Sequence, residues 1–174
     1  MKSKGLGLKI VIGLMLLVLV LFISSSLLAA KSTYTNEIMV NKPIAFVFEK
    51  LSDSNFIPEW NPIAKSVTAE KATENKVGSV YLIKANQMEK GFQVKQTIKT
   101  YTPNSDFSDE LDVENMIATN VYHLESVADG TKITKQTTLV GKDHFIRWVT
   151  KIYKSKFKTA EQKTLESFKK AIEK

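Results

Sequence analysis

The chain has 174 residues, no cysteine and a formal net charge of +7. This length allows one domain of ordinary size plus an appendage, and the lack of cysteine excludes disulfides, thiolate nucleophiles and cysteine metal sites. Three of the 25 basic residues and none of the 18 acidic residues precede residue 31, so residues 31–174 carry a net charge of +4. A charge this mild does not indicate nucleic-acid binding, and no nucleic-acid partner is expected.

Residues 10–30 form an uncharged run of 21 residues near the N-terminus. The run is long enough for a helix that crosses a hydrocarbon core of about 30 Å. Lys2, Lys4 and Lys9 precede it, and positive charge on the short N-terminal side favours keeping that side in the cytoplasm. The sequence therefore predicts a single-pass protein of the cytoplasmic membrane, with its N-terminus in the cytoplasm and its domain outside.

A cleaved signal peptide is the alternative, and its removal would leave a secreted domain. The basic start and the apolar run fit a signal peptide, but cleavage after Ala30 would place Leu28 where a small residue is preferred. Both hypotheses export the domain. The predicted division is a basic segment over 1–9, the apolar helix over 10–30, a polar linker over 31–36 and a domain over 37–174.

The domain opens with a strand-like alternation over residues 34–41 and a helical pattern over 42–53. Pro43 suits the first helical turn, and the apolar residues that follow it recur every three or four positions. The next stretch, DSNFIPEWNP over residues 53–62, contains two prolines and cannot continue this helix. We expect a second short helical turn there, whose apolar side chains form either a plug at the end of the core or a lip over a cavity.

Residues 64–140 contain six strand-like segments separated by the turn sequences NKVG, EKG, TPNS, EN and ADG. Short links of this kind produce an antiparallel meander. Phe92, Val94 and Ile98 alternate with polar residues. This alternation predicts a sheet with one buried and one solvent-exposed face. The acidic residues of the fourth segment are expected on a solvated strand face. They are Asp106, Asp109, Glu110, Asp112 and Glu114.

Residues 143–174 show helical periodicity without Gly or Pro and predict one helix of about 30 residues, or roughly 45 Å. An apolar stripe of this length needs a sheet to pack against. The other side is basic, with five cations and no acidic residue. They are Arg147, Lys151, Lys154, Lys156 and Lys158. Two interpretations are open for this side: a solvated helix face, or a contact of these residues with anionic lipid head groups.

The order of strand, two short helices, six strands and long helix resembles the SRPBCC superfamily, as do the stretches NKPIAFVFEKLSDSNFIPEWNP and YHLESVADGTKIT. This group includes START-like lipid-transfer domains, polyketide cyclases and dehydrases, and the birch-pollen allergen family. The resemblance covers about residues 33–173. It implies an α+β helix-grip fold, in which a curved seven-stranded antiparallel sheet surrounds the long C-terminal helix. It also implies an apolar cavity between them, with the segment over 53–62 at one end.

On this resemblance we expect a membrane-anchored, extracytoplasmic binding domain for a hydrophobic small molecule or lipid. A polyketide cyclase- or dehydrase-like enzyme and a structural or stress-response domain with a filled core stay open as alternatives. Ten residues are predicted to line the cavity. They are Phe56, Trp60, Tyr81, Phe92, Gln96, Asn120, Tyr122, Phe145, Trp148 and Ile152.

The sequence contains no recognisable catalytic constellation, and neither a cofactor nor a metal is expected. His123 and His144 lack metal-site spacing, and no glycine-flanked nucleophile is present. Alternation with its apolar neighbours predicts His123 on the surface, and His144 is expected at a helix start. A proton-transfer enzyme needs a titratable group inside the cavity. The pattern does not settle whether Asp109 and Lys135 face inward.

Overall fold

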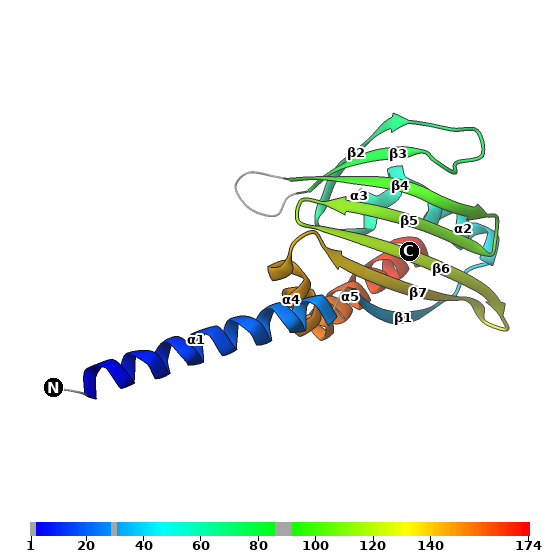
Figure 1. Cartoon of the computed structure of the whole chain (residues 1–174). Coiled ribbons are helices and arrows are strands. Elements are labelled where there is room, and N and C mark those ends of the chain that lie inside the picture. The colour runs from blue at the N-terminus through cyan, green and yellow to red at the C-terminus, as the bar shows by residue number, and fades with distance from the viewer. Residues whose placement is uncertain (1–2, 29–30, 86–91) are drawn as a thin grey trace.

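The structure, a computed structural model, describes residues 3–28, 31–85 and 92–174 and consists of an apolar helix followed by an α+β domain (Figure 1). Seven antiparallel strands form a sheet in the order β1-β7-β6-β5-β4-β3-β2. The strands are β1 Ser32–Val40, β2 Ala64–Lys71, β3 Val80–Ala85, β4 Phe92–Thr102, β5 Asp106–Val113, β6 Met116–Val127 and β7 Gly130–Gly141. The helices are α1 Ser3–Leu28, α2 Ile44–Ser52, α3 Ile57–Trp60, α4 His144–Ile152 and α5 Lys154–Glu173, with a 3-10 turn η1 over Ser54–Phe56.

The sheet curves around α5, and its alternating inward side chains form the core with α2 and α5 (Figure 1). Ile133 of β7, Val47 of α2 and Phe168 of α5 are fully buried at this junction. The outward residues of the strands face solvent. His123 of β6 is exposed, as expected. The helix-grip fold that the resemblance implied is therefore confirmed, and the predicted alternation is present on its strands.

The predicted second helical turn is present as η1 and α3. The side chain of Asp53 accepts a hydrogen bond from the backbone N–H of Asn55 at 3.0 Å and so begins η1. Pro58 lies in the first turn of α3, where a missing N–H has no cost. Trp60 ends this helix with its ring edge-on to Phe168 of α5, at 5.4 Å between ring centroids. The prolines thus hold α3 across one end of the core.

The predicted single helix over residues 143–174 is divided in two. Tyr153, with φ −91° and ψ 13°, separates α4 from α5. The first turn of α4 packs against Gly141, where a Cβ would collide with the backbone of Arg147. Close packing at the end of β7 fixes the start of α4, and the break at Tyr153 lets α5 run along the concave face of the sheet. The sequence carries neither Gly nor Pro at this break.

The predicted linker over residues 31–36 lies mostly in the sheet, because β1 begins at Ser32. Its inward residues Ser32, Tyr34 and Asn36 are buried, and the strand pairs with β7 from Ser32 opposite Leu139 onward. Polar composition suggested a linker, but pairing with a central strand satisfies the backbone groups of these residues. The end of the predicted apolar helix, residues 29–30, lies outside the described residues, as does the turn sequence EKG.

The N-terminal helix α1 projects away from the domain (Figure 1). Its segment Gly7–Ser24 is long and apolar enough to cross a membrane, which agrees with the expected span. The same test is passed by a signal sequence near the N-terminus, so the two hypotheses remain. Near its C-terminal end α1 contacts α4, where the rings of Phe22 and Trp148 lie 5.9 Å apart.

Gly130, at the start of β7, offers a test of the fold. Its φ of +137° is open to glycine alone, and a Cβ there would collide with the carbonyl oxygen of Val40 on β1. We expect Gly130→Ala to lower the free energy of unfolding by more than about 1 kcal/mol in chemical denaturation. Asp129→Ala, at the exposed neighbouring position, should change it by less than about 0.5 kcal/mol. Equal stability of the two variants would contradict this account of the turn.

Candidate functional site

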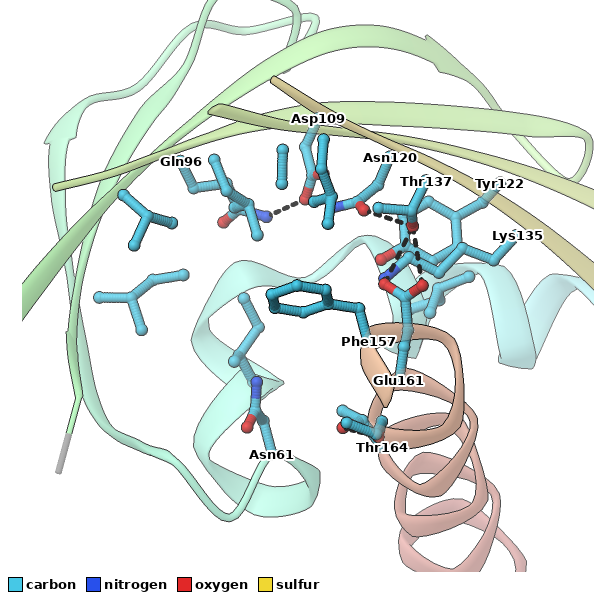
Figure 2. Close-up of a pocket in the computed structure, with 18 of the residues that line it drawn as sticks. Asn61, Gln96, Asp109, Asn120, Tyr122, Lys135, Thr137, Phe157, Glu161 and Thr164 are labelled. Atoms are coloured by element: carbon cyan, nitrogen blue, oxygen red, sulfur yellow. Dashed lines mark hydrogen bonds and ion pairs between the residues drawn. The ribbon is translucent and has the colours of Figure 1, made fainter. Parts of the chain in front are cut away.

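A cavity of about 280 Å³ lies between the concave face of the sheet, α3 and the first half of α5 (Figure 2). Its wall is mostly apolar, because each strand turns its alternate apolar residues inward. Representative wall residues are Ile57, Ile83, Phe107, Leu111, Leu139 and Phe157. A smaller set of polar and ionisable side chains enters the same space from β4, β5, β6, β7 and α5. The cavity therefore combines an apolar wall with one polar region.

Asp109 of β5 is the centre of the first half of this polar region (Figure 2). It is 3% exposed and accepts a hydrogen bond from Nε2 of Gln96 at 2.5 Å. It accepts a second from Nδ2 of Asn120 at 2.8 Å. Burial raises the pKa of Asp109, although the two amide donors favour its charged form. A carboxyl group is therefore held rigidly in the cavity wall by strands on both sides.

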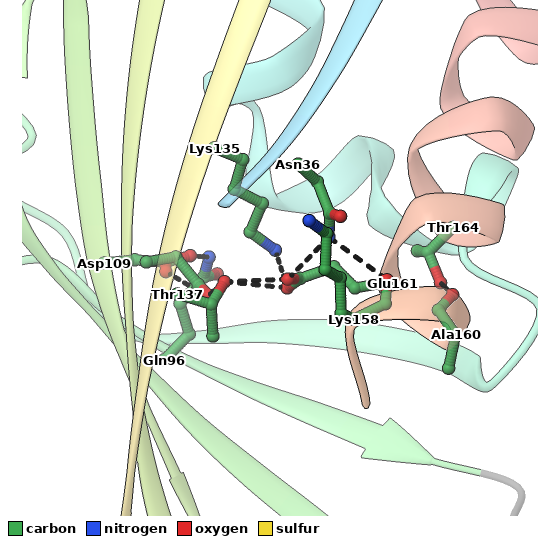
Figure 3. A network of polar contacts seen from close by, with 10 residues as sticks. Asn36, Gln96, Asp109, Lys135, Thr137, Lys158, Ala160, Glu161 and Thr164 are labelled. Carbon is green, nitrogen blue, oxygen red and sulfur yellow. Dashed lines mark hydrogen bonds and ion pairs between the residues drawn. The ribbon is translucent and has the colours of Figure 1, made fainter. Parts of the chain in front are cut away.

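Glu161 of α5 and Lys135 of β7 form the second half (Figure 3). Lys135 Nζ lies 2.5 Å from Glu161 Oε1, and both side chains are nearly buried. Thr137 Oγ1 lies 2.9 Å from both carboxylate oxygens, and Asn36 Nδ2 donates to Oε2 at 3.3 Å. Burial opposes the ammonium form of Lys135, but interactions with Tyr122, Glu161 and Asp109 outweigh burial and raise its pKa. The ion pair joins the sheet to α5.

Thr137 connects the two halves, because its hydroxyl also lies 2.9 Å from Oδ1 of Asn120. A single hydroxyl proton can be donated to either Glu161 or Asn120 at one time. The amide of Asn120 then carries the link on to Asp109. The two halves are thus one network, in which a change of charge at one carboxyl group can reorient the donors of the other.

Two tyrosines, Tyr34 and Tyr122, lie beside this network. Burial and the nearby carboxylate of Glu161 raise the pKa of both Tyr34 and Tyr122, so both are neutral phenols at neutral pH. Lys135 Nζ lies 5.0 Å from the ring centroid of Tyr122, within the range of a cation–π contact. The cation of Lys135 is therefore enclosed by a carboxylate and an aromatic face.

Two buried polar atoms of the cavity wall have no hydrogen-bond partner among the described residues. They are Oε1 of Gln96 and Nε1 of Trp60. An unpaired buried acceptor or donor costs roughly 1–3 kcal/mol. The wall thus offers one acceptor and one donor whose hydrogen bonds are unmade.

Four of the ten residues predicted to line the cavity lie in its wall: Trp60, Gln96, Asn120 and Tyr122. They come from α3, β4 and β6, and sequence alternation placed all three strand residues on the inward face. That these residues contact a ligand stays a prediction.

Three further predicted residues pack beside the cavity. Tyr81 and Phe56 pack against the main core cluster, and Phe92 packs against a second cluster with Val94. Phe56 also receives the ammonium group of Lys50 at 5.5 Å from its ring centroid. Their inward or core-side orientation follows the predicted pattern, but the described cavity wall does not include them.

The remaining three, Phe145, Trp148 and Ile152, lie on α4 and away from the cavity. Phe145 and Ile152 are 58% and 53% exposed, and Phe145 stacks on Trp148 with a centroid distance of 6.1 Å. The prediction assumed one straight helix with one stripe. The break at Tyr153 separates the α4 stripe from that of α5, so only the latter faces the sheet.

Sequence analysis left the orientation of Asp109 and Lys135 open and did not single out Glu161, although the pattern contained a signal for each. Asp109 has the same alternation parity as Leu111, and Lys135 the same parity as Ile133, so both are inward. The expectation of a solvated face for Asp109 is therefore wrong, whereas Asp112 and Glu114 are exposed as expected. Glu161 lies four residues after Phe157, within the apolar stripe of α5.

A curved antiparallel sheet that wraps around a long helix defines the helix-grip fold. Residues 31–173 match the sequence model of the family described as "Polyketide cyclase / dehydrase and lipid transport". The chain belongs to this family, as the resemblance implied. A comparison with curated proteins gave no match.

Solved structures agree with the fold. The chain is similar to Ara h 8.0201, with 15% identity, a TM-score of 0.63 and coverage of 83% of this chain and 99% of that chain. It is similar to the di-domain ARO/CYC protein BexL of the BE-7585A biosynthetic pathway, with 13% identity, a TM-score of 0.66 and coverage of 82% and 50%. A Staphylococcus aureus protein of unknown function gives 12% identity, a TM-score of 0.62 and coverage of 83% and 97%. At these identities the structures support the fold alone.

The ion pair between Lys135 and Glu161 can be tested by a double-mutant cycle. Lys135→Met leaves a buried carboxylate without its cation and should lower the free energy of unfolding by about 3–5 kcal/mol. The double variant Lys135→Met, Glu161→Met should recover most of this loss, since neither charge then remains buried. Lys132→Met is the matched control, because the partly exposed pair of Lys132 with Glu37 lies on the outer face of the same strand. It should cost less than about 1 kcal/mol. Additive effects of the two buried substitutions would contradict the coupling.

The raised pKa of Asp109 predicts a pH dependence of stability. A carboxyl group with a higher pKa in the folded state binds protons more tightly when folded, so stability falls as pH rises from the unfolded to the folded pKa. Asp109→Asn should remove this loss and be at least as stable as the wild type at neutral pH. Denaturation between acidic and neutral pH measures it. Asp106→Asn should have the opposite sign, because hydrogen bonds from Ser105 and His123 lower the pKa of Asp106. A less stable Asp109→Asn variant at neutral pH would refute the burial argument.

Proposed function

We propose that this protein is a membrane-anchored, extracytoplasmic domain that binds a hydrophobic small molecule or lipid in the cavity over α5. The observation that carries the proposal is the cavity of about 280 Å³, apolar over most of its wall and polar at one side. Family membership supports it, since the family description includes lipid transport. The predicted span of α1 supports the anchor, and the lysines before it support the orientation.

The dimensions and lining of the cavity favour a compact ligand. Small-molecule pockets span roughly 300–1,000 Å³ and place a few polar groups among apolar ones. This cavity, at about 280 Å³, lies just below that range, which matches a ring system or a single short acyl chain better than a whole phospholipid. The charged groups of Lys135 and Glu161 already neutralise each other. The cavity therefore needs no charged ligand to balance them, and a neutral ligand fits.

The two unpaired wall atoms indicate where a polar group of the ligand would bind. A hydroxyl group can donate to Oε1 of Gln96, and a carbonyl oxygen can accept from Nε1 of Trp60. Each hydrogen bond would satisfy an atom that is otherwise buried without a partner. A hydrophobic molecule that carries an oxygen function therefore fits the wall better than a pure hydrocarbon.

A second candidate function is proton-transfer chemistry of the cyclase or dehydrase kind. The specific observation in its favour is Asp109, a buried carboxyl group with a raised pKa in the cavity wall. A buried carboxyl group with a raised pKa binds a proton more readily than an exposed one and can act as a general acid or base. Structural networks raise pKa values in the same way, and Asp109 is already engaged by two amide donors. We therefore place this function second.

Filling the cavity tests the binding function. Ala118 of β6 is buried in the cavity wall, so Ala118→Phe should occupy the ligand space. We expect the affinity of the full chain in nanodiscs for the neutral probe N-phenyl-1-naphthylamine to fall at least tenfold, about 1.4 kcal/mol. Empty nanodiscs give the background. Val121→Phe, on the exposed face of the same strand, should bind as the wild type does. Equal affinities in the folded wild type and Ala118→Phe would refute binding in this cavity.

Ligand recovered from the purified full chain separates the two functions. Organic extraction followed by mass spectrometry should yield the same molecule from the wild type and from Asp109→Asn if the domain only binds. A molecule that accumulates in Asp109→Asn and differs from the wild-type one by the elements of water would favour the dehydrase-like function instead.

A further inference from the structure

Helix α4 presents an apolar face that points away from the sheet. Phe145, Trp148 and Ile152 are spaced at i, i+3 and i+7 and so share one face. Phe145 and Ile152 on this face are exposed, whereas Thr150 on the other side of α4 is buried. The first turn meets Gly141 at close range. Packing within the domain therefore accounts for the Thr150 side of α4 and leaves its apolar face uncovered.

The apolar face adjoins the end of the segment that is long and apolar enough to cross a membrane. That segment is Gly7–Ser24, and the ring of Phe22 within it lies 5.9 Å from Trp148. At 1.5 Å per residue, Phe22 lies about 3 Å along the helix axis from Ser24. With Gly7–Ser24 as the membrane span, Trp148 lies at the depth where the hydrocarbon of a bilayer gives way to head groups, which is where tryptophan is enriched.

Exposed cations accompany the apolar face. Lys151, Lys154, Lys156 and Lys158 are all exposed, and the ion pairs formed among the described residues involve none of them. Arg147 has a different role, since its Nε donates to the carbonyl oxygen of Gly141 at 3.0 Å. Lys151 lies on α4, and Lys154, Lys156 and Lys158 lie in the first turns of α5. An apolar helix face with exposed lysines nearby is typical of a segment that lies in the interface of an anionic membrane.

We infer that α4 is an interfacial helix, which inserts Phe145, Trp148 and Ile152 at the surface of an anionic bilayer while Lys151, Lys154, Lys156 and Lys158 contact lipid head groups. The inference rests on the proposed anchor, because α1 must remain attached to place α4 at this depth. It goes beyond tethering, since α4 fixes the orientation of the domain and not only its distance from the membrane.

This orientation turns one end of the cavity toward the bilayer. Lys142, just before α4, donates its backbone N–H to the carbonyl oxygen of Asn115 at 2.9 Å and so holds the β5–β6 hairpin beside α4. Val113 and Met116, which flank that hairpin, line the cavity and are partly exposed, as is Phe157 just after the break. The β5–β6 hairpin, α4 and α1 lie at the same end of the domain (Figure 1), and Val113, Met116 and Phe157 line the cavity there.

The chain has no cysteine, so single cysteines can be labelled without competition. We would place the fluorophore NBD at Phe145→Cys, Ile152→Cys, Val121→Cys or Leu16→Cys in the full chain, reconstituted into vesicles of phosphatidylcholine and phosphatidylglycerol. The expected result is blue-shifted, severalfold brighter emission at positions 145, 152 and 16, quenched by a lipid-attached quencher. Position 121, on the outer face of the sheet, should report water.

The reference positions separate failure of this inference from failure of the anchor. Emission from 145 and 152 that matches 121, with position 16 in hydrocarbon, overturns the interfacial helix and leaves the anchor intact. Position 16 in water overturns the anchor and this inference with it. Lys151→Glu with Lys154→Glu should shift emission at position 152 toward that of water, whereas Lys84→Glu with Lys99→Glu on the sheet should not. Equal emission with both pairs overturns the role of the lysines.

Discussion

The ion pair between Lys135 and Glu161 spans the gap between the sheet and the helix that the sheet grips. Two charges in an apolar interior are stable only if each has a partner and the remaining hydrogen-bonding capacity is filled. Thr137 and Asn36, both on strands, hydrogen-bond the carboxylate of Glu161. The ring of Tyr122 covers the ammonium group of Lys135. The position of α5 over the sheet is therefore set by a directional contact as well as by apolar packing.

The same constraint explains why the domain contains a cavity instead of a filled core. Beyond the ion pair, Asp109, Asn120 and Gln96 bind one another along the sheet surface. Apolar side chains that filled this space would displace these groups and break their hydrogen bonds. The loss of those hydrogen bonds would exceed the free energy gained from the new apolar contacts. Below them, Phe168 and Leu165 pack the opposite end of the helix completely. One end of the helix-grip is thus solid, and the other keeps a space whose wall is part apolar and part polar.

The break at Tyr153 gives the two parts of the C-terminal region different surroundings. After the break, α5 buries Leu165 and Phe168 against the sheet. Before it, α4 follows the end of β7 and meets α1 through Trp148 and Phe22. The division assigns one segment to the ligand space and the other to the end of the molecule that carries the apolar N-terminal helix.

The sequence by itself determined which face of β4, β6 and α5 is buried, through their period-2 and period-3.6 patterns, and its resemblance to the SRPBCC superfamily implied the helix-grip arrangement of these elements. Parity along the strands also contained the inward positions of Asp109 and Lys135, and it placed Gln96, Asn120 and Tyr122 correctly. Tertiary structure alone decided that Asp109 and Glu161 belong to one network, since the two residues are 52 positions apart and meet through Asn120 and Thr137. It also decided the break at Tyr153, where the sequence has neither Gly nor Pro, because the contact of α4 with Gly141 and the grip of the sheet on α5 impose different directions on two helices of similar local propensity.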